Sequence, residues 1–205
     1  AINGERVGTL ADIECFSFYP TKNMTTGEGG MVTTNDEKLY HMLDSIRNHG
    51  RPDSALGQYE HIRFGLNLRI TDLGSAIGRV QLQKLPVFNQ KREQNANRFL
   101  SELKDVQGII LPSYPEDFHH VWHQFTIRSS NRESLSEFLK SQGIETRTYY
   151  PRLIQDYPHL EQSKSSCPIA EKVVSEVISL PVHPGLSMGD IEYIISSVKG
   201  WSKEL

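Results

Sequence analysis

The stretch that decides the fold is IECFSFYPTKNMTTGEGG, which occupies residues 13–30 of the 205-residue chain. Residues 13–19 are aromatic and β-favouring and Pro20 follows them, so we expect a strand that ends there. Residues 21–30 are polar and glycine-rich and predict a loop, and residues 31–34 predict a short second strand. Because a strand end is rigid, a residue placed just after it can be aimed into a site.

One lysine and one serine stand at this strand end. Lys22 lies in the loop, and Ser17 precedes it within the expected strand. A lysine amine can act as a nucleophile, and a serine hydroxyl with neighbouring loop amides can bind an anion such as a phosphate. An amine beside an anion site is what a pyridoxal 5'-phosphate pocket requires, since the aldehyde needs a lysine and the phosphate needs an anchor. The spacing alone leaves open that Lys22 is a solvated surface charge.

Composition narrows the class of protein. The chain has 22 Lys and Arg against 25 Asp and Glu, a net charge of −3, and a sequence pI near 6.3, which argues against binding to nucleic acid or to an anionic membrane. No apolar stretch approaches the roughly 18 residues of a membrane helix, and Glu5 and Arg6 are charged where a signal peptide would be apolar. Cys15 and Cys167 lie far apart, so a disulfide framework and a cysteine zinc site are not expected. The expected protein is a cytoplasmic enzyme or binding module.

The rest of the chain predicts alternating helices and strands. Asn35 or Asp36 can cap a helix that ends near residues 49–50, and a long loop follows over residues 51–66. A helix capped at Thr71 or Asp72 should break or kink at Pro86. Beyond it we expect a mostly polar connector helix over residues 87–103 and then a small α/β lobe. In that lobe we predict a strand at 121–127, another that starts at 144–146, and helices that begin near 131, 169 and 187. Residues 177–180 are a short apolar segment that ends at Pro181.

The residues of the first stretch closely resemble the catalytic-lysine motif of the DegT/StrS family of sugar aminotransferases, which are fold-type I enzymes that use pyridoxal phosphate. The likeness continues in order along essentially the whole chain, over residues 6–12, 65–72, 76–82, 149–151 and 177–181. The resemblance implies an α/β fold that corresponds to the C-terminal part of such an enzyme. Residues 1–86 would be the C-terminal part of the cofactor-binding large domain. Residues 87–205 would be the connector helix and the small C-terminal α/β domain.

The resemblance also implies an activity. The enzyme would move an amino group from an amino acid, with glutamate as the expected donor, to a keto sugar linked to a nucleoside diphosphate. Lys22 would bond to the cofactor aldehyde and then carry protons, and Ser17 would bind the cofactor phosphate. Members that deoxygenate sugars have lost this lysine, so its presence favours transamination.

Four further residues match candidate positions of the family. Asn67 matches a residue that reaches across a dimer to the neighbouring subunit's cofactor phosphate, which implies a homodimer. Arg69 is a candidate for phosphate or substrate contact, or a surface charge at a helix start. Tyr19 stands where relatives carry His or Tyr near the cofactor, and packing in the core is the alternative. Tyr149 stands where the family usually has histidine, and it is a candidate for substrate binding.

Some parts of the family's pocket would lie upstream of Ala1. These are a Gly-Thr phosphate loop, an aromatic or histidine that stacks on the pyridine ring, and an aspartate that pairs with the ring nitrogen. We therefore expect a C-terminal fragment or one half of a split protein, and Asn3-Gly4, a hairpin turn signal with no strand before it, agrees with this. The alternative is a non-catalytic remnant or regulatory subunit that keeps the fold without holding the cofactor.

Three competing sites are weaker. His119, Val121 and His123 would share one face of a strand, but no carboxylate or cysteine cluster accompanies them, so we expect no metal site. Residues 27–30 resemble a phosphate loop only loosely. A small basic cluster could meet a nucleoside diphosphate or form a solvated face, and its members are Arg47, His49 and Arg51.

Overall fold

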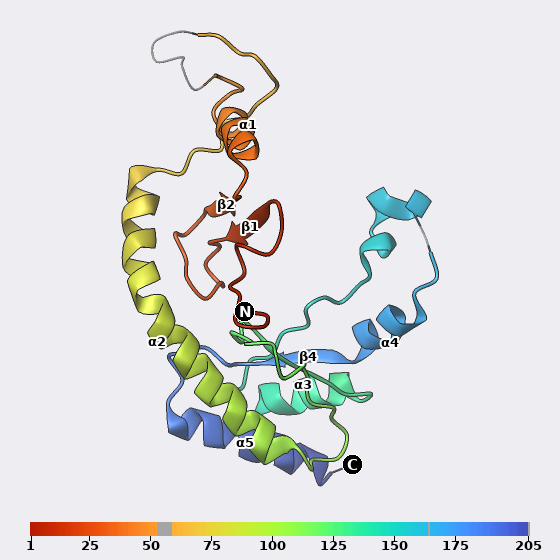
Figure 1. Ribbon diagram of the computed structural model, residues 1–205. Helices are drawn as coiled ribbons and strands as arrows, with labels where there is room; N and C mark the ends of the chain where they lie inside the picture. The colour runs from red at the N-terminus through yellow and green to blue at the C-terminus, as the bar shows by residue number, and fades with distance from the viewer. Residues whose placement is uncertain (53–58, 164, 205) are drawn as a thin grey trace. The chain divides into compact units, whose positions relative to one another are not determined.

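The computed structural model describes residues 1–52, 59–163 and 165–204, and the chain divides into two compact units (Figure 1). The first unit is Ala1–Val87 with Pro115–His120, and the second is Phe88–Tyr114 with Val121–Leu205. Helix α2 begins in the first unit and ends in the second. The loop expected over residues 51–66 includes residues 53–58, which lie outside the described part.

The first unit contains an antiparallel ribbon of two strands, β1 (Glu14–Ser17) and β2 (Gly30–Thr33). Both strands expected from the sequence are present, and β1 is shorter than the segment predicted. Ser17 pairs with Gly30, and a Cβ atom at Gly30 would lie 2.7 Å from the backbone oxygen of Phe16, so this position requires glycine. The ribbon places Ser17 where the chain leaves β1 for the connecting loop.

Helix α1 (Glu37–Arg47) begins at a capping aspartate, as the sequence predicts. The carboxylate of Asp36 accepts two backbone N–H groups of the first turn, at 2.7 and 3.1 Å. These bonds satisfy donors that have no partner within the helix. After the helix the chain turns through Gly50 at φ +74°, where a Cβ atom would lie 1.8 Å from the backbone oxygen of Arg63. Only glycine allows the two backbone segments to approach this closely.

Helix α2 (Asp72–Leu103) is one continuous helix of 32 residues, so, of the break or kink expected at Pro86, the break is wrong. The helix begins where the hydroxyl of Thr71 accepts the N–H of Gly74 at 3.0 Å. Pro86 has no N–H group, so the carbonyl of Leu82 loses its helical partner. Both residues are exposed, and water can bond to that carbonyl instead.

The second unit is built on the antiparallel pair β3 (Phe125–Arg128) and β4 (Val177–Leu180). A backbone bridge adds residue 110 beside β3, and another adds Arg147 beside β4. The expected strand over residues 144–146 is reduced to this second bridge, next to its predicted place. Helices α3 (Arg132–Ser141) and α5 (Met188–Ser202) contribute to the same core. The largest buried side chains of this core are Phe99, Leu103, Trp122, Phe125, Ile127, Leu135, Leu139, Ile178, Ile191, Val198 and Trp201.

The remaining elements of the second unit are α4 (Pro168–Glu176) and two short 3-10 helices, η1 (Ile154–Asp156) and η2 (Pro158–Ser163). Helix α5 begins at the predicted cap. The hydroxyl of Ser187 accepts the N–H of Asp190 at 3.1 Å, and the Asp190 carboxylate accepts the N–H of Ser187 at 2.8 Å. This reciprocal pair is a capping box, and it fixes the start of the helix.

The strand expected over residues 121–127 begins only at Phe125. Trp122 has φ +47°, in the left-handed region, which is incompatible with a strand. Its indole is almost fully buried and lies 5.5 Å, between ring centroids, from Phe125. The side chain of Arg92 donates to the backbone oxygens of Trp122 and His123, both at 3.1 Å. A strand here would have formed backbone hydrogen bonds to a neighbouring strand. Burial of the indole and the two bonds from Arg92 stabilise the observed backbone instead.

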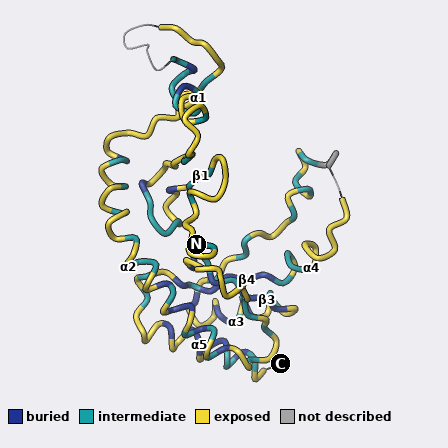
Figure 2. The backbone as a smooth tube through the Cα atoms, in the orientation of Figure 1, coloured by how far each residue is buried: buried dark blue, intermediate teal, exposed yellow. Residues whose placement is uncertain are grey.

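Burial differs sharply between the two units, as Figure 2 shows. Among the described residues, Phe18 is the one buried apolar side chain of the first unit, whereas the core cluster belongs to the second. The β1–β2 ribbon exposes apolar side chains on both of its faces, with Met31 at 55% and Val32 at 46% exposure. In the described ranges, no helix is both long enough and apolar enough to cross a bilayer.

Candidate functional site

The loop between β1 and β2, residues 18–29, is held closed at its base. The N–H of Phe18 donates to the carbonyl of Gly29 at 2.9 Å, which extends the ribbon by one bond. The carbonyl of Phe18 accepts the N–H of Thr26 at 3.0 Å and the hydroxyl of Thr25 at 2.9 Å. These bonds draw the end of the loop back to its start. We call residues 18–29 the lysine loop.

Lys22 lies at the end of the first turn of the lysine loop and is half-buried. Its backbone N–H donates to the carbonyl of Tyr19 at 2.9 Å. Ser17 is exposed at the end of β1, and its hydroxyl oxygen accepts the N–H of Tyr19 at 3.3 Å. Ser17 keeps its own hydroxyl proton for donation to an anion. The structure therefore brings Ser17, Tyr19 and Lys22 together, as the sequence predicts.

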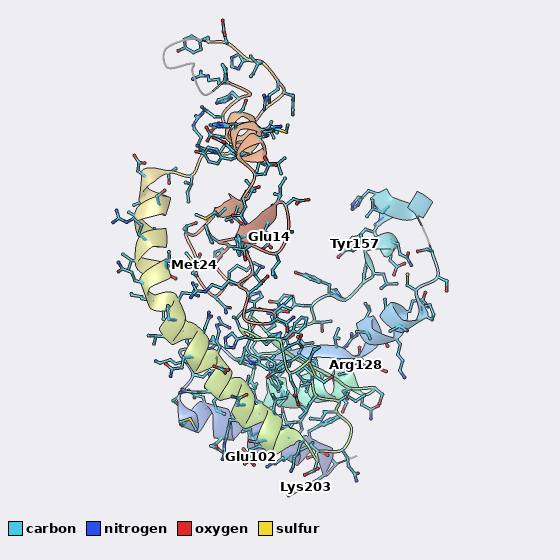
Figure 3. All side chains as sticks on the ribbon, viewed as in Figure 1. Glu14, Met24, Glu102, Arg128, Tyr157 and Lys203 are labelled. Atoms are coloured by element: carbon cyan, nitrogen blue, oxygen red, sulfur yellow. The ribbon has the colours of Figure 1, made fainter. Side chains whose placement is uncertain are left out.

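The start of β1 is anchored by Glu14, which Figure 3 labels together with Met24 on the lysine loop. The Glu14 carboxylate accepts the backbone N–H of Gly8, of Leu10 at 2.7 Å and of Ala11 at 3.0 Å. Bonds to an ionised carboxylate are stronger than bonds between neutral groups. Glu14 thereby ties the turn that precedes the ribbon to the strand that carries Ser17.

Asn67 and Arg69 lie on a neighbouring segment of the first unit. This segment runs antiparallel to the end of α1, and Asn67 is bridged to Asn48. The guanidinium of Arg69 donates to the side-chain oxygen of Asn48 at 2.7 Å. Both candidate residues are exposed. Asn48 is a site neighbour that sequence reasoning missed, because its contact with Arg69 spans 21 residues of chain.

Tyr149 belongs to the second unit and is half-buried. Its ring meets the ring of Tyr150 edge to face, with centroids 5.5 Å apart. Tyr150 is the more exposed of the two, at 65%. The ring contact of Tyr149 is therefore with its neighbour Tyr150, and both residues belong to the second unit.

The histidine cluster at residues 119–123 does not have the backbone that the sequence predicts. These residues form no strand, so the prediction that His119, Val121 and His123 share one strand face is wrong. Burial, together with the nearby His119 and the N-terminal ammonium, lowers the pKa of His120 below its usual value. In the residues that the structure describes, no three His, Cys, Asp or Glu side chains gather closely enough to hold a metal ion.

Two of the three side chains in the expected basic cluster already have partners. Arg47 donates to the carboxylate of Asp44, with its Nε 2.7 Å from the acceptor oxygen. Arg51 lies over the ring of Tyr59, 5.1 Å from the ring centroid. These contacts fit the solvated-face interpretation of the cluster better than a diphosphate site.

The residues present fit the two polar ends of pyridoxal phosphate. Lys22 offers an amine for the aldehyde, and Ser17 offers a hydroxyl for the phosphate. Ser17 is the last residue of β1 and Lys22 lies on the loop that follows it, and helix α2 leads from this first unit into the second.

Comparison with known proteins identifies the family. Residues 1–199 match the DegT/DnrJ/EryC1/StrS aminotransferase family, and the chain belongs to it. The expected family and the expected α/β fold class are thereby confirmed.

Two relatives illustrate the similarity. The chain is 36% identical over 200 residues to UDP-N-acetyl-3-dehydro-alpha-D-glucosamine 3-aminotransferase of Acidithiobacillus ferrooxidans, covering 97% of this chain and 53% of the relative. It is 38% identical over 202 residues to dTDP-3-amino-3,6-dideoxy-alpha-D-galactopyranose transaminase of Aneurinibacillus thermoaerophilus, covering 96% and 53%. The chain thus spans about half the length of these curated relatives.

A solved structure gives the same result for the fold. The crystal structure of S. venezuelae DesV in complex with a ketimine intermediate superposes with a TM-score of 0.93 at 34% identity. The superposition covers 100% of this chain and 55% of that one. The two units described above therefore have the fold of part of a sugar-aminotransferase subunit.

Proposed function

We propose that this chain is the C-terminal part of a pyridoxal-phosphate-dependent aminotransferase. The enzyme moves an amino group from an amino acid, with glutamate as the donor, to a keto sugar carried on a nucleoside diphosphate. Residues 1–86 are assigned to the cofactor-binding domain and residues 87–205 to the small domain. The observation that carries the proposal is the joint attachment of Ser17 and Lys22 to the backbone of Tyr19. Family membership and the names of both relatives support the reaction class.

The roles of the residues follow from their chemistry. When bound, pyridoxal phosphate supplies an aldehyde carbon that takes up the amino group and a ring that withdraws electrons. Lys22 would hold that carbon through its amine. In its free form the same amine would serve as the base that accepts a proton from the amino donor and as the acid that returns it.

Other residues bind and orient. Ser17 donates its hydroxyl to the phosphate, and Tyr19, at the same strand end, contacts the cofactor or substrate. Asn67 binds the phosphate held by a second subunit, so the working form is a homodimer. The compartment assigned to this enzyme is the cytoplasm. Arg69, in the first unit, is assigned to phosphate or substrate binding, and its guanidinium is suited to a diphosphate because it can donate two parallel bonds. Tyr149, in the second unit, is a separate candidate for substrate binding.

Absorbance spectroscopy tests the proposal. The chain mixed with pyridoxal phosphate should gain a visible absorption band that Lys22→Ala abolishes, and in the native gene product addition of glutamate should remove the band. A matched control, Lys140→Ala, changes an exposed lysine of α3 and should leave the band intact. Retention of the band in Lys22→Ala would remove Lys22 from the mechanism.

The alternative is a regulatory or incomplete form of the same fold. It predicts no band with this chain at any cofactor concentration. The same measurement on the native gene product separates the two alternatives. If this chain is an incomplete fragment, the native gene product should show the band that the chain lacks. A regulatory subunit gains none in either form.

A further inference from the structure

Thr26 is the buried polar residue of the lysine loop. Only 7% of it is exposed. Its hydroxyl donates to the carbonyl of Glu28 at 2.8 Å, and its N–H donates to the carbonyl of Phe18 at 3.0 Å. Both polar groups of Thr26 are thus used within the loop, and its methyl group is left to pack.

The methyl group of Thr26 faces helix α2. A Cβ atom at Gly78 of that helix would lie 3.0 Å from the Cγ2 atom of Thr26. A Cβ atom at Gly29 would lie 2.4 Å from its hydroxyl oxygen and 3.4 Å from Cδ1 of Ile70. Thr26 therefore packs tightly between two glycines. A Cβ atom at Gly29 would force a shift, and one at Gly78 would require the Thr26 methyl group to move by a few tenths of an ångström.

A second contact lies one helical turn further along α2. The side-chain oxygen of Gln81 accepts the N–H of Thr25 at 3.4 Å. Residues 78 and 81 lie on the same face of a helix, so the two contacts act side by side. Together they attach the far end of the lysine loop to α2, while the bonds at Phe18 hold its base.

We propose that Thr26, seated against Gly78, is a positioning residue for Lys22. This inference rests on the proposed function, since it concerns how the amine is held for the cofactor. Lys22 is four residues from Thr26, and its N–H bond to Tyr19 fixes the other side of the turn. A loop attached at both ends restricts the directions in which the amine can point. Placement errors of about 1 Å can cost a reaction up to roughly a hundredfold.

Three variants test the contact. Gly78→Ala adds a methyl group that displaces Thr26, and since alanine favours a helix more than glycine, α2 itself is not weakened. The double variant Thr26→Ser with Gly78→Ala removes the clashing Cγ2 atom and keeps the hydroxyl, so it should restore the contact. Gly200→Ala in α5 is the matched control, because the nearest atom to its new Cβ would be 3.7 Å away.

Two readouts on the whole chain separate this inference from the proposed function. The first is the pH profile of borohydride trapping of pyridoxal phosphate at Lys22, measured relative to trapping at Lys140. The second is hydrogen exchange of the backbone amides of residues 19–27, which needs no cofactor.

Gly78→Ala should reduce relative trapping at Lys22 between about fivefold and a hundredfold and shift its pH profile. The same variant should speed loop exchange, and the double variant should restore both quantities. Unchanged exchange in Gly78→Ala, or no recovery in the double variant, overturns the positioning role. If wild-type Lys22 shows no preference over Lys140 while exchange responds as expected, the proposed function fails and the loop attachment stands.

Discussion

Ser17 and Lys22 are bonded to opposite sides of the same residue. The hydroxyl of Ser17 accepts the N–H of Tyr19 at 3.3 Å, and the N–H of Lys22 donates to the carbonyl of Tyr19 at 2.9 Å. Local backbone geometry thereby holds the Ser17 hydroxyl close to the backbone from which the Lys22 side chain starts. A cofactor with a phosphate at one end and an aldehyde at the other can bridge such a pair.

Ser17→Ala should weaken cofactor binding without removing the amine. A hydrogen bond to a charged group contributes about 1.5–3 kcal/mol, which corresponds to roughly a 10- to 150-fold rise in Kd. Titration of the absorption band with pyridoxal phosphate measures this change. Ser175→Ala, which changes an exposed serine of α4, serves as the control and should leave Kd unchanged. An unaltered Kd in Ser17→Ala would rule out the phosphate role.

Pro86→Ala should stabilise the chain. Proline costs about 3 kcal/mol relative to alanine inside a helix, and the more flexible unfolded alanine chain offsets about 0.4–1 kcal/mol of that gain. The free energy of unfolding in urea should therefore rise by about 1–3 kcal/mol. A fall in stability would mean that the fold depends on proline at this position of α2.

Asp190→Asn should destabilise the chain in a pH-dependent way. Hydrogen bonds from the side chain and backbone of Ser187 hold the pKa of the Asp190 carboxyl below its usual value. Because the folded pKa is lowered, the stabilisation is complete above the unfolded value near 3.9 and is lost as the pH falls through the folded pKa.

Urea unfolding at two pH values checks this dependence. Wild type should be more stable than Asp190→Asn at pH 7, and the two should converge near pH 2. Ser187→Ala should cost about 1 kcal/mol at pH 7, because it removes the cap of α5. A difference between wild type and Asp190→Asn that stayed constant with pH would contradict the role of the ionised carboxylate.

Helix starts could be predicted from the sequence, because each depends on contacts between residues that are close together in the chain. Asp36 and Ser187 mark their helix starts because a cap bonds to backbone groups two or three residues away. The position of Ser17 and Lys22 at one strand end left a surface lysine open, and the resemblance to a family made them site candidates. Contacts between distant residues left no such signal. The left-handed Trp122 follows from burial of its indole, and the fit of Thr26 against Gly78 joins residues 52 positions apart.

The most direct test of the central claim is peptide mapping after borohydride reduction of the chain with pyridoxal phosphate. The account predicts one adduct per chain at low cofactor excess, on the peptide that carries Lys22, and no such saturating adduct in Lys22→Ala. Adducts spread over the exposed lysines in proportion to their exposure, with Lys22 no more labelled than Lys140, would contradict it.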